Sequence, residues 1–242
     1  MIEYPKPQPV GRPAMLQNWC NLTFLHWRMP LAEIAARVPA PLQVESCHGS
    51  GWLGITPFRI AGLRPPLLPA LPWISEFPET NCRTYVKGPD GESGIWFFSL
   101  DAARAPAVLG ARIGYGLPYA WSRMRVQVAG RRVRYESRRR WPSRPAMARI
   151  EVEYGEPVQA GELEIFLTAR FRLYSFIAGR LTYTKVDHPP WPLQAARVIR
   201  LEQTLTRAAG LPEPGGAPLV HFSPGVRTRI GFPELAIAQT RS

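Results

Sequence analysis

Cysteine is scarce in this chain of 242 residues, and its spacing excludes the common paired motifs. Cys20, Cys47 and Cys82 are odd in number, lie far apart and form no Cys-x-x-Cys pair. The four histidines show no i, i+4 spacing, and no cysteine is near enough in the sequence to complete a zinc pattern. Phosphate-loop, dinucleotide and Gly-x-Ser-x-Gly motifs are also missing. We therefore expect a reducing compartment, no metal site and no cofactor.

Long apolar runs are missing as well. The N-terminal sequence MIEYPKPQPVGRP has no apolar core of the kind found in signal peptides. The most apolar later stretch, PPLLPALPWI at 65–74, is too short and too rich in proline to span a bilayer. We expect a cytoplasmic protein without a membrane partner, in which this stretch packs over one end of the core.

Lysine occurs only three times, so arginine supplies nearly all of the positive charge behind the net charge of +12. Eight arginines interleave with Tyr135 and Trp141 in the segment 123–141, a pattern that also occurs on surfaces that bind single-stranded nucleic acid. Apolar residues alternate with these arginines, which is typical of the solvent-facing side of a sheet. We favour the solvated face and treat nucleic-acid binding as the less favoured alternative.

Proline and glycine are abundant, and their spacing predicts a β-rich protein. The 27 prolines and 20 glycines fall between short apolar runs without a fixed period, as expected for many short strands joined by turns. We expect an extended arm over residues 1–17 and one domain over residues 18–242, because no repeat or linker divides the chain. Short helices are expected after Pro30, near 102–111 and within 162–171.

Turn signals arrange several of these strands as hairpins. A Pro-Asp-Gly turn joins the strand at 77–87 to the apolar run IWFFSL at 95–100, so the two should pair. Ala129-Gly130 lies between two alternating runs and predicts a second hairpin. Near the C-terminus, Pro224-Gly225 is expected to form a turn between two further strands.

The strand FPETNCRTYV at 77–86 carries an unusual polar row. Side chains alternate across a strand, so Glu79, Asn81, Arg83 and Tyr85 share one face and Cys82 lies on the other. Such a row faces water or lines a cavity. An ion pair between Glu79 and Arg83 with a purely structural role remains an open alternative.

Several stretches together resemble the YqjF-like family of uncharacterised bacterial proteins, in the same order over nearly the whole chain. They are NLTFLHWRMP, RVPAPLQV, GWLGITPFRI, FPETNCRTYV, FFSLDA, ARIGYGLPY, LTARFRLY and HPPWPL. That family is similar in fold to acetoacetate decarboxylase. The resemblance implies a β-rich α+β fold, in which a large, bent antiparallel sheet wraps into a barrel or cone around a cavity, with short helices outside.

The similarity to the decarboxylase also implies site residues, and it breaks at a critical one. Glu79 falls where that enzyme has its active-site glutamate. Ala111, Arg112 and Pro118 match the segment that precedes its Schiff-base lysine, but the lysine position is Tyr119 here. A tyrosine has no amine and cannot form an imine, so we do not expect Schiff-base decarboxylation.

Two hypotheses for the cavity follow. In the first, the protein acts on a small carboxylated or keto compound by cofactor-free acid–base chemistry. Glu79 is then the candidate general base and Tyr119 a hydrogen-bond or proton donor, while Asn81 contacts the ligand and Arg83 or Arg112 grips its anionic group.

In the second hypothesis, the protein is a non-catalytic barrel for a small acid, with Trp27, Trp52 and Trp96 as candidate wall residues. The arginines of TARFRLY at 168–174 could also point inward, and the corner His188-Pro-Pro-Trp191 is interpreted as structural packing. The sequence leaves the ligand's identity open, and an oligomer is compatible with it.

Overall fold

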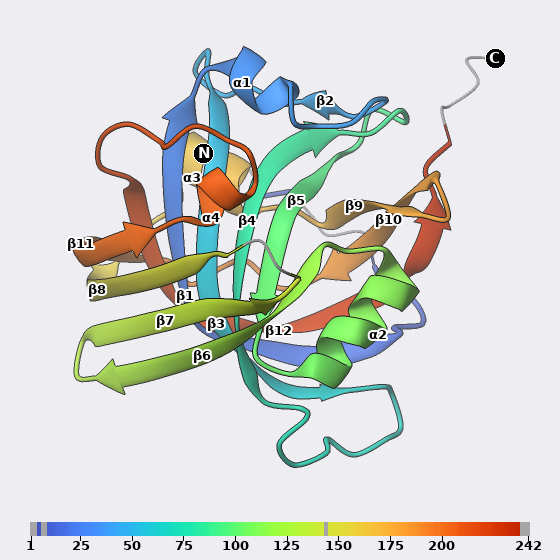
Figure 1. Ribbon diagram of the computed structural model, residues 1–242, viewed down its shortest axis with the longest axis horizontal. Helices are drawn as coiled ribbons and strands as arrows, with labels where there is room; N and C mark the ends of the chain where they lie inside the picture. Colours follow the sequence, from blue (N-terminus) through green and yellow to red (C-terminus); the bar gives the residue numbers. More distant parts are fainter. Residues whose placement is uncertain (1–3, 6–8, 143–144, 238–242) are drawn as a thin grey trace.

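A single twelve-stranded sheet dominates the structure (Figure 1), a computed structural model that describes residues 4–5, 9–142 and 145–237. The strands are β1 (Met15–Met29), β2 (Gln43–Val44), β3 (Gly51–Arg64), β4 (Phe77–Lys87), β5 (Ser93–Ala102), β6 (Tyr119–Ala129), β7 (Arg132–Trp141), β8 (Met147–Pro157), β9 (Arg172–Ile177), β10 (Arg180–Asp187), β11 (Gln194–Gln203) and β12 (Leu219–Leu235). The helices are α1 (Leu31–Ala35), α2 (Ala105–Tyr115), α3 (Glu162–Thr168) and α4 (Leu205–Ala208). The β-rich α+β class with short helices is confirmed.

The sheet closes on itself into a ring. Strands follow the order β12-β1-β3-β4-β5-β9-β10, and β10 pairs again with β12. A second arc, β6-β7-β8-β11, leaves this ring at β5 and returns to it at β12. The two expected hairpins are present, because β4 pairs with β5 and β6 pairs with β7. Most pairs are antiparallel as expected, but β5 runs parallel to both β6 and β9.

The strand β4 separates two different interiors. Cys82 points toward an apolar core shared with β7 and β8, where Val133 and Ile150 also lie. Glu79, Asn81 and Arg83 point to the other side, into the space enclosed by the closed ring. The alternation of polar and apolar residues in β4 is therefore an alternation between cavity and core.

The C-terminal segment differs from the expected strand–turn–strand. Leu219–Leu235 is one strand that contains Pro224-Gly225, and its pairing with β1 keeps the same register on both sides of Pro224. Gly225 has a φ of 130°, and a Cβ atom there would lie 1.9 Å from the carbonyl oxygen of Trp19. A glycine at this position therefore allows the two backbones to approach closely, and β12 continues past it without reversing.

The apolar segment after β3 also differs from expectation. It forms a loop that protrudes from the molecule (Figure 1), and Leu67 and Trp73 are exposed on it. The helix near 102–111 is longer than expected, since α2 extends to Tyr115. At the N-terminus, β1 begins at Met15, and residues 1–3 and 6–8 of the expected arm lie outside the described part of the chain.

None of the helices in the described ranges has the length and apolar character needed to traverse a bilayer.

Candidate functional site

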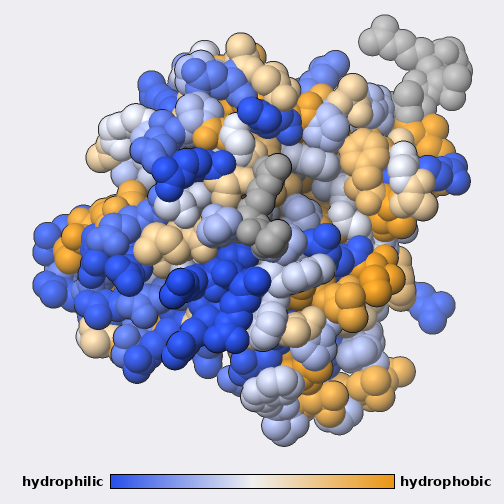
Figure 2. Space-filling model, in the orientation of Figure 1, coloured by the Kyte–Doolittle hydropathy of each residue, from blue (hydrophilic) through white to orange (hydrophobic). Residues whose placement is uncertain are grey.

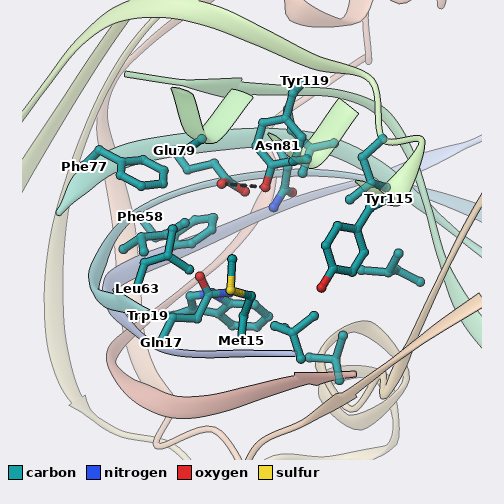
Figure 3. A pocket seen from close by; sticks show the side chains of 18 of the residues that line it. Met15, Gln17, Trp19, Phe58, Leu63, Phe77, Glu79, Asn81, Tyr115 and Tyr119 are labelled. Carbon is teal, nitrogen blue, oxygen red and sulfur yellow. Dashed lines mark hydrogen bonds between the residues drawn. The ribbon is translucent and has the colours of Figure 1, made fainter. Parts of the chain in front are cut away.

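A cavity of about 590 Å³ lies inside the closed ring. Strands β1, β3, β4, β5, β9, β10 and β12 contribute to its wall, and α2 and the loop after β3 border it. Most of the wall is apolar, as Figure 3 shows for Met15, Phe58, Leu63 and Phe77. The volume is in the range of cavities that hold a small molecule.

Glu79 and Tyr119 meet at one side of this cavity. The Tyr119 hydroxyl donates a hydrogen bond of 2.9 Å to Oε2 of Glu79, as drawn in Figure 3. Glu79 comes from β4 and Tyr119 from the first position of β6, and the parallel pairing of β5 with β6 brings them together. The structure thus brings together the two residues expected to act as base and donor, and these roles stay predictions.

Burial changes the acid–base character of this pair. Burial is the largest effect and raises the pKa of Glu79, the Tyr119 hydrogen bond lowers it, and the negative charge of Asp101 raises it, so that the pKa is about 8. Burial, followed by the charge of Glu79, raises the pKa of Tyr119 well above its usual value. At neutral pH the Glu79 carboxyl is therefore mostly protonated, and Tyr119 keeps its proton.

Asn81 and Thr56 add polar groups next to this pair. They are directly opposite each other on β4 and β3, and both line the cavity. The Asn81 Oδ1 and Thr56 Oγ1 atoms are buried without a hydrogen-bond partner among the described residues. Buried polar atoms are normally paired, so these two atoms are unusual in facing the cavity without a hydrogen bond.

Arg83 extends the same polar wall with a positive charge. Its side chain is only 7% exposed, and its Nε atom has no hydrogen-bond partner among the described residues. Gly54 is the residue opposite it on β3, and a Cβ atom there would lie 3.3 Å from the Arg83 Cγ. Its guanidinium carbon lies 5.5 Å from the ring centre of Phe24. An aromatic ring has no net charge, so this contact does not neutralise the positive charge of Arg83.

The charge of Arg83 has no counterion in the described part of the chain. Two other arginines at the cavity differ in this respect, because Arg170 pairs with Glu45 and Arg172 pairs with Asp90 at 2.6 Å. Glu79 does not pair with Arg83, which removes the structural ion pair as an explanation of the polar row. Arg83 is thus a buried cation that faces a cavity.

Arg112 lies outside the cavity wall. Its guanidinium donates a 2.6 Å hydrogen bond to the backbone carbonyl of Tyr119 and stacks over the ring of Trp141 at 4.9 Å. These contacts turn the Arg112 side chain toward β6 and β7. The expectation that Arg112 grips an anion stays a prediction.

The tryptophans on the wall are also different from those expected. Trp27, Trp52 and Trp96 belong to three apolar clusters away from the cavity, whereas Trp19 and Trp191 line it. Trp19 and Trp191 stack with ring centres 5.9 Å apart. These two tryptophans line the cavity because of how the ring of strands closes. The alternation of residues within a strand does not predict that closure.

The corner His188-Pro-Pro-Trp191 reaches the cavity too. His188 lines it, and its Nδ1 donates a hydrogen bond of 2.8 Å to the carbonyl oxygen of Pro189. Burial lowers the pKa of His188, and the hydrogen bond to the Pro189 carbonyl opposes this effect only in part. The imidazole is therefore neutral at pH 7. The proline-fixed corner was the sequence signal for this residue, which sequence reasoning assigned to packing.

No lysine of the described residues lines the cavity. Lys87 is exposed at the end of β4, and Lys185 forms an ion pair of 3.5 Å with Glu234. Lys6 falls outside the described ranges. Across residues 4–5, 9–142 and 145–237, no group of histidine, cysteine and acidic side chains could hold a metal ion.

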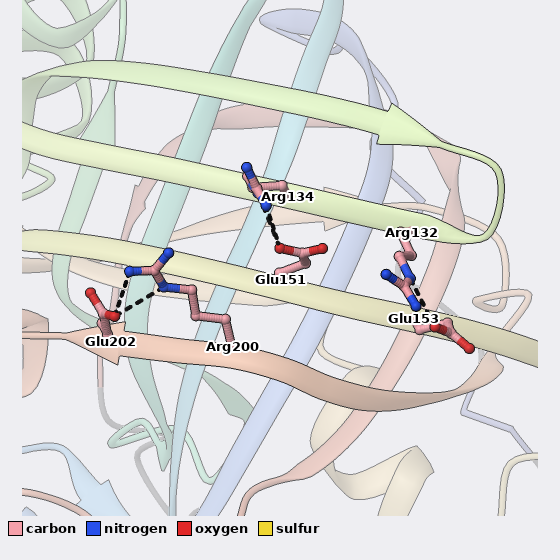
Figure 4. A network of polar contacts seen from close by, with 6 residues as sticks. All are labelled: Arg132, Arg134, Glu151, Glu153, Arg200 and Glu202. Carbon is pink, nitrogen blue, oxygen red and sulfur yellow. Dashed lines mark hydrogen bonds and ion pairs between the residues drawn. The ribbon is translucent and has the colours of Figure 1, made fainter.

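The arginine-rich hairpin of β6 and β7 lies on a different surface, where acidic residues neutralise part of its charge. Figure 4 shows ion pairs from β7 to β8, namely Arg132 with Glu153 at 2.9 Å and Arg134 with Glu151 at 2.8 Å. Arg139 pairs with the buried Asp101 at 2.7 Å. The hairpin is therefore less positive than its arginine count indicates.

Comparison with solved structures identifies the architecture around the site. The acetoacetate decarboxylase of Legionella pneumophila superposes with a TM-score of 0.66 at 13% identity, over 99% of this chain and 92% of that one. An acetoacetate decarboxylase-like enzyme of Sphingomonas wittichii gives 0.65 at 13% identity, over 93% and 94%. The enduracididine biosynthesis enzyme MppR, complexed with pyruvate, gives 0.64 at 10% identity, over 94% and 92%. The fold is therefore that of acetoacetate decarboxylase.

Sequence comparison identifies nearer relatives. The uncharacterized protein YqjF of Bacillus subtilis is 36% identical over 217 residues, which are 89% of this chain and 89% of that protein. The family model DUF2071, described as an uncharacterized conserved protein, matches residues 16–227, from the start of β1 into β12. Since the family model covers most of the chain, the chain belongs to the DUF2071 family of uncharacterized conserved proteins.

Proposed function

We propose that this protein binds a small, partly apolar compound with a carboxylate and a keto group, and that Glu79 and Tyr119 transfer a proton on it without a cofactor. The observation that carries the proposal is Arg83. A buried guanidinium without a counterion is costly, and an anionic ligand in the cavity would supply the missing charge. The apolar wall would accommodate the rest of the ligand.

The proposed chemistry is proton exchange at the carbon next to the keto group. The Glu79 carboxylate removes the proton from that carbon, and the electron pair moves to the keto oxygen to give an enolate. Return of the proton from Glu79-COOH to carbon restores the keto compound and the carboxylate. A hydrogen bond from Asn81 or Tyr119 would stabilise the enolate oxygen.

This chemistry differs from imine-based decarboxylation, because Tyr119 occupies the lysine position and no described lysine lines the cavity. The related fold of MppR holds pyruvate, a keto acid. At 10% identity this likeness supports only the capacity of the fold for such a ligand.

The test is exchange of hydrogen for deuterium at the carbon next to the keto group, followed by NMR with medium-chain 2-keto and 3-keto acids. Wild-type protein should accelerate exchange, with a rate that rises with pH through a midpoint of about 8. Glu79→Gln should abolish the acceleration and leave ligand affinity within about threefold, because the amide keeps the size and neutrality of the protonated acid. Acceleration that survives in Glu79→Gln would exclude Glu79 as the base.

A non-catalytic binding protein is the second candidate, and the largely apolar wall favours it. In that case the same acids would raise the unfolding temperature by mass action, and wild-type protein would not accelerate their exchange. Nucleic-acid binding by the hairpin has less support because of the ion pairs between β7 and β8. Anisotropy titration with an oligonucleotide at low salt tests it.

A further inference from the structure

We propose that the rim of the cavity docks onto an anionic lipid bilayer, and that the ligand is an amphipathic acid which enters the cavity from that bilayer. The docking surface depends only on the residues of the rim. The identity of the ligand also rests on the proposed function. This inference departs from the expectation of no membrane partner, and the reason is the loop after β3.

The loop after β3 carries large apolar side chains that are exposed to solvent. Leu67 is fully exposed and Trp73 is 66% exposed, and Leu68 and Leu71 are each more than half exposed. Their sequence led us to expect packing over the core, and the structure has no described segment that covers them. Several large apolar side chains exposed next to one another generally mark a contact surface. Leucine and tryptophan are the residues that insert at the boundary between lipid headgroups and acyl chains.

The helix α2 borders the same cavity and carries further exposed apolar side chains. Its outward residues Leu109 and Ile113 are more than half exposed, and Ala107 and Ala111 line the cavity from the same helix. Figure 2 shows apolar side chains gathered over α2 and over the protruding loop. The exposed apolar side chains therefore lie on two elements that border one cavity.

The charges around the rim fit an anionic surface. No aspartate or glutamate occurs in residues 60–75 or 103–118, whereas both segments contain arginine. Arg104 donates a 2.6 Å hydrogen bond to the carbonyl oxygen of Trp73, and its guanidinium carbon lies 4.8 Å from the centre of the Trp73 ring. This contact holds the tryptophan at the rim beside a cation. Arginines next to membrane-inserting side chains interact with anionic headgroups.

The rim is continuous with the cavity wall. Leu68 and Leu71 belong to both, because they line the cavity and are exposed on the loop. An acyl chain could therefore move from the bilayer into the cavity along apolar side chains only, while its acidic group remains the part recognised by Arg83. A ligand that is both acidic and long-chained explains why so apolar a cavity contains an unpaired buried arginine.

Vesicle co-sedimentation tests the docking surface. The probes are vesicles of phosphatidylcholine alone and of phosphatidylcholine mixed with phosphatidylglycerol. The variant combines Leu67→Asp with Trp73→Asp, since neither residue lines the cavity in the ring. The control is Val128→Asp, which adds one negative charge, against the two of the double variant, at a residue 50% exposed at the far end of β6.

Wild type and Val128→Asp should sediment with the phosphatidylglycerol vesicles, and the double variant should bind them at least about tenfold more weakly. Equal binding by all three proteins, or no binding by wild type, would overturn the inference. A concentration-dependent dimer in light scattering that disappears in the double variant would assign the surface to a second copy of the chain and also overturn it.

The two proposals fail separately. Wild type that binds a water-soluble keto acid but no vesicle retains the proposed function and loses the docking surface. Vesicle binding without any binding of keto acids retains the surface and removes the proposed function.

Discussion

The Glu79 carboxyl shows how one residue obtains unusual chemistry from its position on a strand. Side chains alternate along a strand, so Glu79 points into the ring, where it is buried from water. The hydroxyl of Tyr119, from another strand, donates a hydrogen bond to one of the carboxyl oxygens of Glu79. Its pKa of about 8 follows from burial first. The sequence was sufficient to identify this residue, because a strand with an acid, an amide and a base on one face is easily recognised.

The titration of Glu79 should be visible in folding stability. The unfolded chain loses this proton near pH 4.5, and the native protein keeps it to about pH 8, so native stability falls as pH rises between these values. Glu79→Gln lacks this titration. Its stability relative to wild type should therefore increase by roughly 3–5 kcal/mol from pH 5 to pH 9.

Urea unfolding of both proteins at several pH values measures this difference, since other groups titrate alike in the two. A difference that stays constant with pH would mean that Glu79 has an ordinary pKa in the folded protein.

Tyr119 should act on Glu79 through its hydrogen bond. That bond stabilises the carboxylate and lowers the pKa of Glu79, so Tyr119→Phe should raise this pKa further. The midpoint at which the protonated carboxyl band disappears in infrared difference spectra, taken against Glu79→Gln, should move to higher pH. An unchanged or lower midpoint would show that the phenol does not support the carboxylate.

At the scale of elements, hairpins and short helices could be predicted and long-range pairing could not. The Pro-Asp-Gly turn after β4 and the Ala129-Gly130 turn specify local geometry, so both hairpins followed from the residues. Pro224-Gly225 is the same kind of signal, but it lies in the middle of one strand. Its partner is the backbone of β1, and no local pattern contains that information.

Gly225→Ala tests this account of β12. The new Cβ would lie 1.9 Å from the Trp19 carbonyl oxygen, which is backbone and cannot rotate away, and the φ of 130° would be strained. We expect a loss of roughly 2–4 kcal/mol in unfolding free energy. Ligand affinity should also fall, because Trp19 lines the cavity.

Gly215→Ala is the control, since a Cβ there meets nothing within 4 Å. It should change stability by no more than about 0.5 kcal/mol. Equal stability of the two variants in chemical denaturation would contradict a close approach of β12 and β1.

At the scale of the whole molecule, ring closure creates the cavity. Pairing of β10 with β12 and parallel pairing of β5 with β9 join segments that are distant in the chain. The resemblance to a known fold implied a closed sheet, but the residues themselves did not specify which tryptophans face inward or that the loop after β3 is bare. Those features depend on the register of the pairs and on what lies opposite each face.

The central claim is that an unpaired buried arginine makes this enclosed cavity selective for an acid. Isothermal titration calorimetry of wild type and Arg83→Met with a medium-chain keto acid and its methyl ester tests it directly. The two ligands share an apolar chain and differ in charge. The acid should bind wild type at least about tenfold more tightly than Arg83→Met, whereas the ester should bind both proteins alike. Equal affinities of the acid for the two proteins would contradict the account.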